Sequence, residues 1–377
     1  MQAHLAPVHL QYMEARISQT QATSSWWQQR PLIISGPCSA ETEAQVLQSA
    51  TELAAIGKVH LFRAGIWKPR TRPGSFEGVG EPGLEWLQDA KALTGLPTTI
   101  EVATSRQVEL ALRSGVDALW IGARTTVNPF SVQDVADALK GVNVPVFIKN
   151  PLNADIDLWT GAVERVAKAG IQKIGLIHRG FASYGNTEYR NAPMWHLAIE
   201  MKRRHVGLPF INDPSHISGR REILLEVAQK AIDLGYDGLM LESHPQPDEA
   251  WSDAAQQITA RQLSELLEAV IWRKEDISNV SCHAALEKLR NRIDGLDDEI
   301  IQLLGQRMKV AEHIAEYKKP HDITILQTAR WNWILSRMQL EGGKLGLSEE
   351  FIKQFLDAVH MESIAHQTKV FEQGGQG

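Results

Sequence analysis

The strongest constraint in this sequence is a plan that repeats eight times between Pro31 and about Trp272. In each repeat a short run rich in Val, Ile, Leu or Phe ends in polar or charged residues, and a stretch with apolar residues three and four positions apart follows. Such runs predict buried strands, and such spacing predicts amphipathic helices. The eight runs are Leu32–Ser35, Val59–Arg63, Thr98–Glu101, Ala118–Ile121, Val144–Lys149, Lys173–Ile177, Leu208–Asn212 and Gly238–Glu242.

The alternation predicts a closed α/β barrel, the (β/α)8 or TIM barrel, in which eight parallel strands are surrounded by helices. A doubly wound open sheet is the alternative, but eight nearly even units favour closure. The clearest helical stretches between the runs are Glu41–Ile56, Ser105–Arg113, Asp157–Ala169 and Arg221–Leu234.

The last third of the chain has a different, all-helical pattern. Between His283 and Lys319 there is no proline and apolar residues recur at helical spacing, which predicts a helix of roughly 50 Å. A second helix is expected over Ile325–Leu340, ending before Gly342-Gly343, and a third from Ser348 to about Val370. The first helix is too long for its partners to cover its apolar face, so we expect this three-helix domain to dimerise.

These patterns define a division of the chain into five segments. We expect an N-terminal extension over residues 1–30, a barrel over 31–272, a polar linker over 273–281, a helical domain over 282–370 and a C-terminal tail over 371–377.

Charge and cysteine content narrow the class of protein. The chain has 45 acidic and 39 basic side chains, a net charge of −6, which argues against nucleic acid or a membrane surface as the partner. Its two cysteines, Cys38 and Cys282, follow an N-terminus without the apolar run of a signal peptide, so we expect a cytoplasmic protein.

Cationic side chains recur where the predicted strands end. In a (β/α)8 barrel, functional residues collect at the carboxyl ends of the strands. Converging Arg and Lys side chains there predict a small, strongly anionic ligand that carries phosphate or carboxylate groups. The cations are Arg63, Lys68, Arg70, Arg124, Lys149 and Arg179.

A second set at the strand ends offers sulfur, nitrogen and oxygen donors. The set is Cys38, His216, Glu242 and Asp253. Mixed donors suit a divalent transition metal, whereas Mg²⁺ and Ca²⁺ prefer oxygen alone. A single buried Cys or His is more often structural, but four donor types at one face favour a metal site.

The order of motifs resembles the type I 3-deoxy-D-arabino-heptulosonate 7-phosphate (DAHP) synthases, in the subgroup similar to Kdo-8-phosphate synthases. The resemblance covers about Pro31 to Trp272, and Lys-Pro-Arg-Thr is its most specific part. The motifs are Gly36-Pro37-Cys38-Ser39, Arg63–Thr71, Gly122-Ala123-Arg124, Asp213-Pro214-Ser215-His216 with Gly219-Arg220-Arg221, and Glu242-Ser243-His244-Pro245.

This resemblance implies condensation of phosphoenolpyruvate with erythrose 4-phosphate, assisted by one divalent ion of the Mn²⁺, Fe²⁺, Co²⁺ or Zn²⁺ class. It assigns the metal to Cys38, His216, Glu242 and Asp253. It assigns the binding of phosphoenolpyruvate to Arg63, Arg124, Lys149 and Arg179. It assigns the binding of erythrose 4-phosphate to Lys68, Pro69, Arg70 and Thr71.

The helical third resembles the all-helical chorismate mutases over about Cys282 to Val370. The motifs are Leu289–Asp297, Leu303–Arg307 with Lys318, and Ser363–Gln367. The resemblance implies rearrangement of chorismate to prephenate without a cofactor, in a homodimer whose sites each take an arginine from the partner chain. The residues it assigns to the ligand are Arg290, Arg307, Lys318, Arg330, Ser363 and Gln367.

Two alternatives stay open at this stage. A Kdo-8-phosphate-type synthase would use another sugar phosphate, against which Lys68–Thr71 argues. The helical third would alternatively be a non-catalytic module for dimerisation and allosteric sensing, because Trp331 replaces the usual glutamate and Gln327 a common aspartate.

Overall fold

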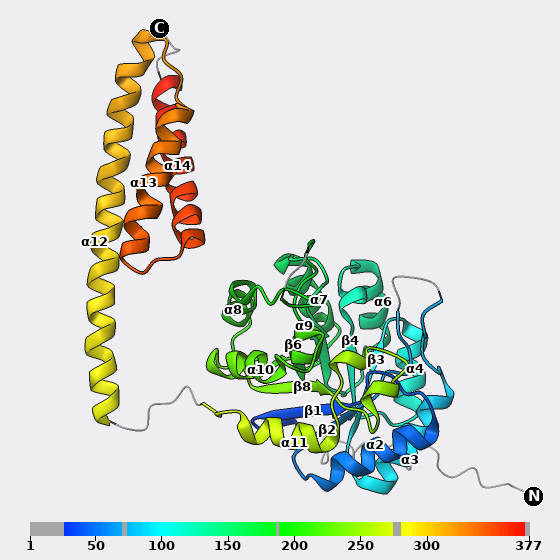
Figure 1. Cartoon of the computed structure of the whole chain (residues 1–377). Coiled ribbons are helices and arrows are strands. Elements are labelled where there is room, and N and C mark those ends of the chain that lie inside the picture. Colours follow the sequence, from blue (N-terminus) through cyan, green and yellow to red (C-terminus); the bar gives the residue numbers. More distant parts are fainter. Residues whose placement is uncertain (1–25, 70–73, 186–187, 274–279, 374–377) are drawn as a thin grey trace, which may run out of the picture. The chain divides into compact units, whose positions relative to one another are not determined.

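The chain consists of two compact units, Met1–Glu275 and Asp276–Gly377. The computed structural model describes residues 26–69, 74–185, 188–273 and 280–373, and Figure 1 shows both units.

The first unit is a closed barrel of eight parallel strands in chain order, which confirms the predicted fold (Figure 1). Closure comes from five paired positions between the first and the last strand, beginning with Leu32 opposite Gly238. The strands are β1 (Leu32–Gly36), β2 (Leu61–Arg63), β3 (Thr98–Val102), β4 (Ala118–Ile121), β5 (Val146–Lys149), β6 (Ile174–His178), β7 (Phe210–Asn212) and β8 (Gly238–Glu242).

Helices surround the barrel on its outside. Several begin at a side chain that caps the first turn: Thr42, Thr104 and Thr259 each accept a backbone N–H from the residue three positions on. The helices are α2 (Glu43–Ala55), α3 (Pro82–Thr94), α4 (Ser105–Arg113), α5 (Ala123–Thr126), α6 (Pro129–Ala138), α7 (Ile156–Lys168), α8 (Trp195–Arg204), α9 (Pro214–Ser218), α10 (Leu224–Asp233) and α11 (Ala260–Ala269).

Alternate strand residues fill two separate apolar layers. Inward-facing side chains such as Ile34, Trp120 and Phe147 pack into one buried cluster, and Trp26 belongs to it although it precedes β1. Outward-facing side chains pack against the helices in a second, larger cluster. The strands are therefore apolar on both faces, as buried parallel strands require, and polar groups are left to the strand ends.

The second unit contains three long helices: α12 (Val280–Lys318), α13 (Thr328–Lys344) and α14 (Glu349–Glu372). Helices α12 and α14 run parallel, since Met308 contacts Ser363 and Glu312 contacts His366 farther along. At 1.5 Å per residue, α12 is about 58 Å long and α14 about 36 Å. The N-terminal half of α12 extends beyond the other two helices (Figure 1).

One boundary differs from the prediction. Helix α13 does not end before Gly342-Gly343 but continues through both glycines to Lys344. A Cβ at position 342 would lie 2.2 Å from Cδ1 of Ile352, so the glycine lets α14 pack closely. Here glycine serves helix contact rather than termination.

In the described part of the chain, no helix has both the length and the apolar character needed to cross a bilayer.

Candidate active site

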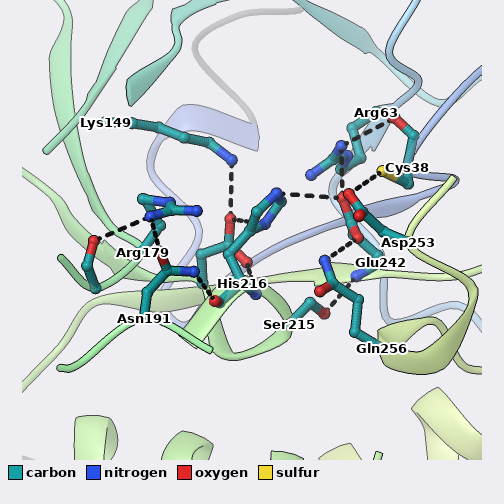
Figure 2. A network of polar contacts seen from close by, with 12 residues as sticks. Cys38, Arg63, Lys149, Arg179, Asn191, Ser215, His216, Glu242, Asp253 and Gln256 are labelled. Carbon is teal, nitrogen blue, oxygen red and sulfur yellow. Dashed lines mark hydrogen bonds and ion pairs between the residues drawn. The ribbon is translucent and has the colours of Figure 1, made fainter. Parts of the chain in front are cut away.

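The carboxyl ends of the strands meet around one polar pocket (Figure 2). Six cationic side chains line it, against two carboxylates, those of Glu101 and Asp253. The lining includes nine predicted site residues: Cys38, Arg63, Lys68, Pro69, Arg124, Lys149, Arg179, His216 and Asp253.

Asp213, directly after β7, organises one side of the pocket. It is the N-cap of α9, where its Oδ1 accepts the N–H of His216 at 3.1 Å, and Pro214 occupies the first helical turn. Its Oδ2 lies 2.8 Å from both Lys149 Nζ and His216 Nδ1. Although burial opposes ionisation, His216 and Lys149 hold the pKa of Asp213 well below its usual range.

Arg63, at the end of β2, is buried with a surplus of donors. Its Nη2 is paired with Glu242 Oε1 at 3.1 Å, and its guanidinium lies 5.0 Å from the centre of the Trp120 ring. Its Nε and Nη1 are buried without a hydrogen-bond partner. Unpaired buried N–H groups are costly, so these two donors indicate an anionic ligand.

Arg179 follows β6 and is only 5% exposed. Its Nη1 donates to neutral oxygens, Asn191 Oδ1 at 2.6 Å and Gly180 O at 3.3 Å. Burial therefore lowers its pKa to about 10, and Asp213 only partly opposes this effect. A phosphate or carboxylate would supply the missing charge partner.

Three of the four predicted metal ligands come together. One ligand atom each from Cys38, Glu242 and Asp253 lies within 4.8 Å of the others. His216 is not in this cluster, but its Nε2 lies 3.7 Å from Glu242 Oε1, and Asp213 occupies its Nδ1 (Figure 2). A carboxylate on one imidazole nitrogen, with the other nitrogen directed at the site, is typical of metal-binding histidines.

The donors fit a divalent transition ion. Glu242 Oε1 is buried and, among the described residues, has the ion pair with Arg63 Nη2 but no hydrogen bond, so it could also contact a metal ion. Burial, with Glu242 nearby, raises the pKa of Cys38 to about 12, and a bound cation would favour the thiolate. One sulfur, one nitrogen and carboxylate oxygens match Mn²⁺, Fe²⁺, Co²⁺ or Zn²⁺ better than Mg²⁺ or Ca²⁺.

A glycine allows Cys38 to approach Arg63. Gly36 has φ +150°, and a Cβ there would lie 2.0 Å from the carbonyl oxygen of Arg63. Lys68 then reaches across, and its Nζ donates to Cys38 O at 2.9 Å and lies 2.6 Å from Cys38 Sγ. Pro69 lines the same pocket, whereas the predicted Arg70 and Thr71 lie outside the described residues.

Three supporting residues escaped the sequence analysis. Gln256 Nε2 donates to Glu242 Oε2 at 2.6 Å, and Gln257 Oε1 accepts the N–H of Cys38 at 3.0 Å. Arg190 Nη1 lies 3.0 Å from Asp253 Oδ1 and 2.6 Å from Gln256 Oε1. Both glutamines follow Asp253 closely, at the end of the short turn Ala254–Gln256 and just after it. Their closeness in sequence to a predicted metal ligand was the signal that could have identified them.

Asn191 was also missed, because it lies in an irregular loop after β6. Its Oδ1 accepts from Arg179, and its Nδ2 donates to the carbonyl oxygen of His216 at 2.6 Å. Asn191 thus links Arg179, which follows β6, to His216 on α9, a role that no sequence pattern indicated.

In the helical unit, only some of the residues predicted to bind chorismate lie close together. Arg307 on α12 donates to Ser363 Oγ on α14, and Gln367 lies one turn beyond Ser363. Ser363 and Gln367 are both buried, and Gln367 Oε1 has no hydrogen-bond partner. These side chains form a small polar site within an otherwise apolar helix contact.

The other three predicted residues lie elsewhere in the unit. Lys318 Nζ donates to the carbonyl oxygen of Ile325 at 2.7 Å, and Arg330 stacks on Trp333 at 4.2 Å. Arg290 pairs with Glu287 at 2.7 Å, 17 positions before Arg307 on the same helix. That separation is about 25 Å, so one chain cannot bring both arginines to one ligand.

Comparison with known proteins assigns both units. Residues 15–279 match the DAHP synthetase I family, and residues 289–368 match chorismate mutase type II. The chain belongs to the DAHP synthetase I family. It joins a DAHP synthase to a chorismate mutase, two enzymes of aromatic amino acid biosynthesis by the shikimate pathway.

Individual relatives of the barrel include both DAHP synthases and Kdo-8-phosphate-type synthases. Phospho-2-dehydro-3-deoxyheptonate aldolase of Thermotoga maritima is 33% identical over 236 residues, 63% of this chain and 68% of that protein. Its crystal structure superposes with a TM-score of 0.57 at 32% identity, covering 63% of this chain and 67% of that one. A 2-dehydro-3-deoxyphosphooctonate aldolase of Syntrophotalea carbinolica is 30% identical over 260 residues, covering 63% of this chain and 89% of that protein.

The contact between Gln256 and Glu242 yields a test of the metal site. Replacing Gln256 with Leu removes the hydrogen bond that orients the Glu242 carboxylate, so affinity for Mn²⁺ or Zn²⁺ should fall about 10- to 100-fold. Titration against a chelating dye measures this affinity. The exposed Gln172→Leu variant is the control, and equal affinities in the two variants would contradict the role of Gln256.

Proposed function

We propose that the barrel is a metal-dependent DAHP synthase whose anion-binding cations hold phosphoenolpyruvate. The observation that supports this most is the surplus of buried donors: two unpaired N–H groups on Arg63, and Arg179 without a carboxylate partner. Phosphoenolpyruvate carries a phosphate and a carboxylate, and these two groups would satisfy both arginines together with Arg124 and Lys149.

The second substrate belongs beside the metal. Lys68 and Pro69 line the pocket next to Cys38, and with Arg70 and Thr71 they would bind erythrose 4-phosphate. Cys38, His216, Glu242 and Asp253 would hold one divalent ion of the Mn²⁺, Fe²⁺, Co²⁺ or Zn²⁺ class. When bound, this ion supplies Lewis-acid polarisation of the sugar aldehyde.

The reaction then depends on orientation and charge. C3 of the enol phosphate attacks the aldehyde carbon, a water adds at C2, and inorganic phosphate leaves, so the product carries one phosphate. Arg63, Lys149 and Arg179 would fix the phosphate and carboxylate so that C3 faces the aldehyde. Their positive charges would also stabilise the phosphate as it departs.

We propose further that the mutase site is completed by a second copy of the chain. Along α12, exposed apolar residues recur at alternating steps of four and three, with Arg307 inside the same stripe. This spacing is that of a helix–helix seam. The stripe consists of Leu289, Ile293, Leu296, Ile300, Leu303, Val310 and Ile314, each at least 45% exposed.

Pairing through this stripe would solve the separation of Arg290 from Arg307. The partner's α12 would bring its own Arg290 to the site that contains Arg307, Ser363 and Gln367, while Lys318 and Arg330 would supply further cations. The rearrangement of chorismate needs no cofactor, because orientation and stabilisation of the ether oxygen suffice.

The residues that line the pocket favour a DAHP synthase over the Kdo-8-phosphate type, and the state of the cysteines favours a cytoplasmic location. Lys68 and Pro69 line the pocket, and their segment is the most specific part of the resemblance to DAHP synthases. Neither cysteine is in a disulfide, which is consistent with a reducing compartment.

An assay of the full chain tests the two activities separately. Phosphoenolpyruvate with erythrose 4-phosphate should yield DAHP and phosphate, and chorismate should yield prephenate. EDTA should abolish only the first reaction, because only the barrel would use a metal. Faster turnover with arabinose 5-phosphate would favour the Kdo-8-phosphate alternative, and failure to convert chorismate would favour a sensing module.

Disrupting the stripe tests the second copy. Ile300→Arg places a charge in the seam, so we expect the molar mass measured by light scattering to fall by at least half and chorismate turnover to fall with it. Gln302→Arg adds the same charge on the opposite side of α12 and should change neither. An unchanged mass for Ile300→Arg would exclude the stripe as the interface.

A further inference from the structure

A third polar side chain shares the face of α14 that carries Ser363 and Gln367. His360 lies three positions before Ser363 and seven before Gln367. At 100° per residue, these separations place His360 within about 60° of Ser363 and 20° of Gln367 around the helix. The three side chains therefore form one stripe along the polar site of the helical unit.

His360 is held by an aromatic contact from the neighbouring helix. Its ring stacks on Trp331 of α13, with ring centroids 4.0 Å apart and an angle of 13° between the planes. Stacking occupies a face of the imidazole and leaves its ring nitrogens free to form hydrogen bonds in the ring plane. Trp331 thus fixes the direction in which His360 can form a hydrogen bond.

The nitrogen that is fixed in this way has no partner. His360 Nε2 is buried and makes no hydrogen bond within the described part of the chain, as is true of Gln367 Oε1 on the same stripe. By contrast, His366 on the same helix has both nitrogens engaged, by Glu312 at 2.6 Å and by Glu362 at 3.2 Å. These two buried polar atoms lack hydrogen-bond partners, which indicates that a bound ligand supplies the missing partners beside Arg307.

The neighbours of His360 favour its neutral form. Burial lowers its pKa, Arg307 lowers it further, and Asp357 acts in the opposite direction. A neutral imidazole carries one donor and one acceptor, which suits an alcohol better than a carboxylate. The cations of the site suit the two carboxylates of chorismate, and a neutral imidazole can form a hydrogen bond with its hydroxyl group.

We propose that His360 binds the hydroxyl group of the ligand through Nε2 and so determines specificity at the helical site. This inference rests on the proposed function of the helical unit. Trp331 stands where a glutamate is usual and supplies no carboxylate. It instead orients the imidazole of His360, which would recognise the hydroxyl group. Trp331 on α13 and His360 on α14 would therefore recognise the hydroxyl group together, within one chain.

The test compares two ligands in the full-length chain: chorismate and an analogue that lacks the hydroxyl group. His360→Phe keeps an aromatic ring against Trp331 but removes the nitrogen. We expect kcat/KM for chorismate to fall about 10- to 100-fold while that for the analogue stays within about twofold. His360→Gln returns a polar group near the position of Nε2 and should restore part of the loss.

Matched measurements separate this role from a structural one. His366→Phe changes the same residue type on the same helix, where both nitrogens already have partners, and should leave the preference for the hydroxyl unchanged. Thermal unfolding of each variant shows whether the helical unit remains folded. An equal loss on both ligands, or no loss for His360→Phe, would overturn the proposal.

Equilibrium binding of both ligands, measured by calorimetry, decides the role of His360 independently of turnover. A wild-type chain that binds chorismate more tightly than the analogue but does not rearrange it, with this preference lost in His360→Phe, would contradict the proposed function and support His360. A chain that converts chorismate but binds both ligands equally would support the function and contradict His360. Binding of neither ligand would contradict both.

Discussion

Placing several cations at one end of a barrel is possible only where buried carboxylates offset their desolvation. Asp213 and Glu242 do so here. Asp213 caps α9 and contacts both Lys149 and His216, while Glu242 pairs with Arg63. Among the described residues, two buried nitrogens of Arg63 still lack a hydrogen-bond partner and Arg179 Nη1 donates only to neutral oxygens, so the pocket suits an anion. The barrel's two apolar layers serve to hold these charges at fixed positions.

The sequence predicted the architecture well because periodicity reports burial directly. Eight apolar runs became eight parallel strands, and side chains at their ends converged on one pocket. Contacts made by irregular loops were beyond such reasoning. Asn191 and Gln256 support the site through side-chain hydrogen bonds, which have no periodicity in the sequence. Helix α13 continues through Gly342 because of a tertiary contact with Ile352.

The roles of individual residues remain predictions, and their geometry differs between the two units. In the barrel, Cys38, Glu242 and Asp253 already lie together, so one chain suffices to hold a metal. In the helical unit, Arg290 and Arg307 are about 25 Å apart on one straight helix, and only a second chain can bring such groups together. If the proposed dimer forms, the same sequence encodes one site by closure of a sheet and another by association of two chains.

The central claim is that the barrel's chemistry depends on a metal bound through Cys38. Metal content and both activities of purified Cys38→Ala, compared with Cys282→Ala, test it most directly, since Cys38 is buried at the site whereas Cys282 is exposed. We predict that Cys38→Ala retains no metal and forms no DAHP, yet still converts chorismate. A Cys38→Ala protein that keeps its metal and its synthase activity would contradict the account.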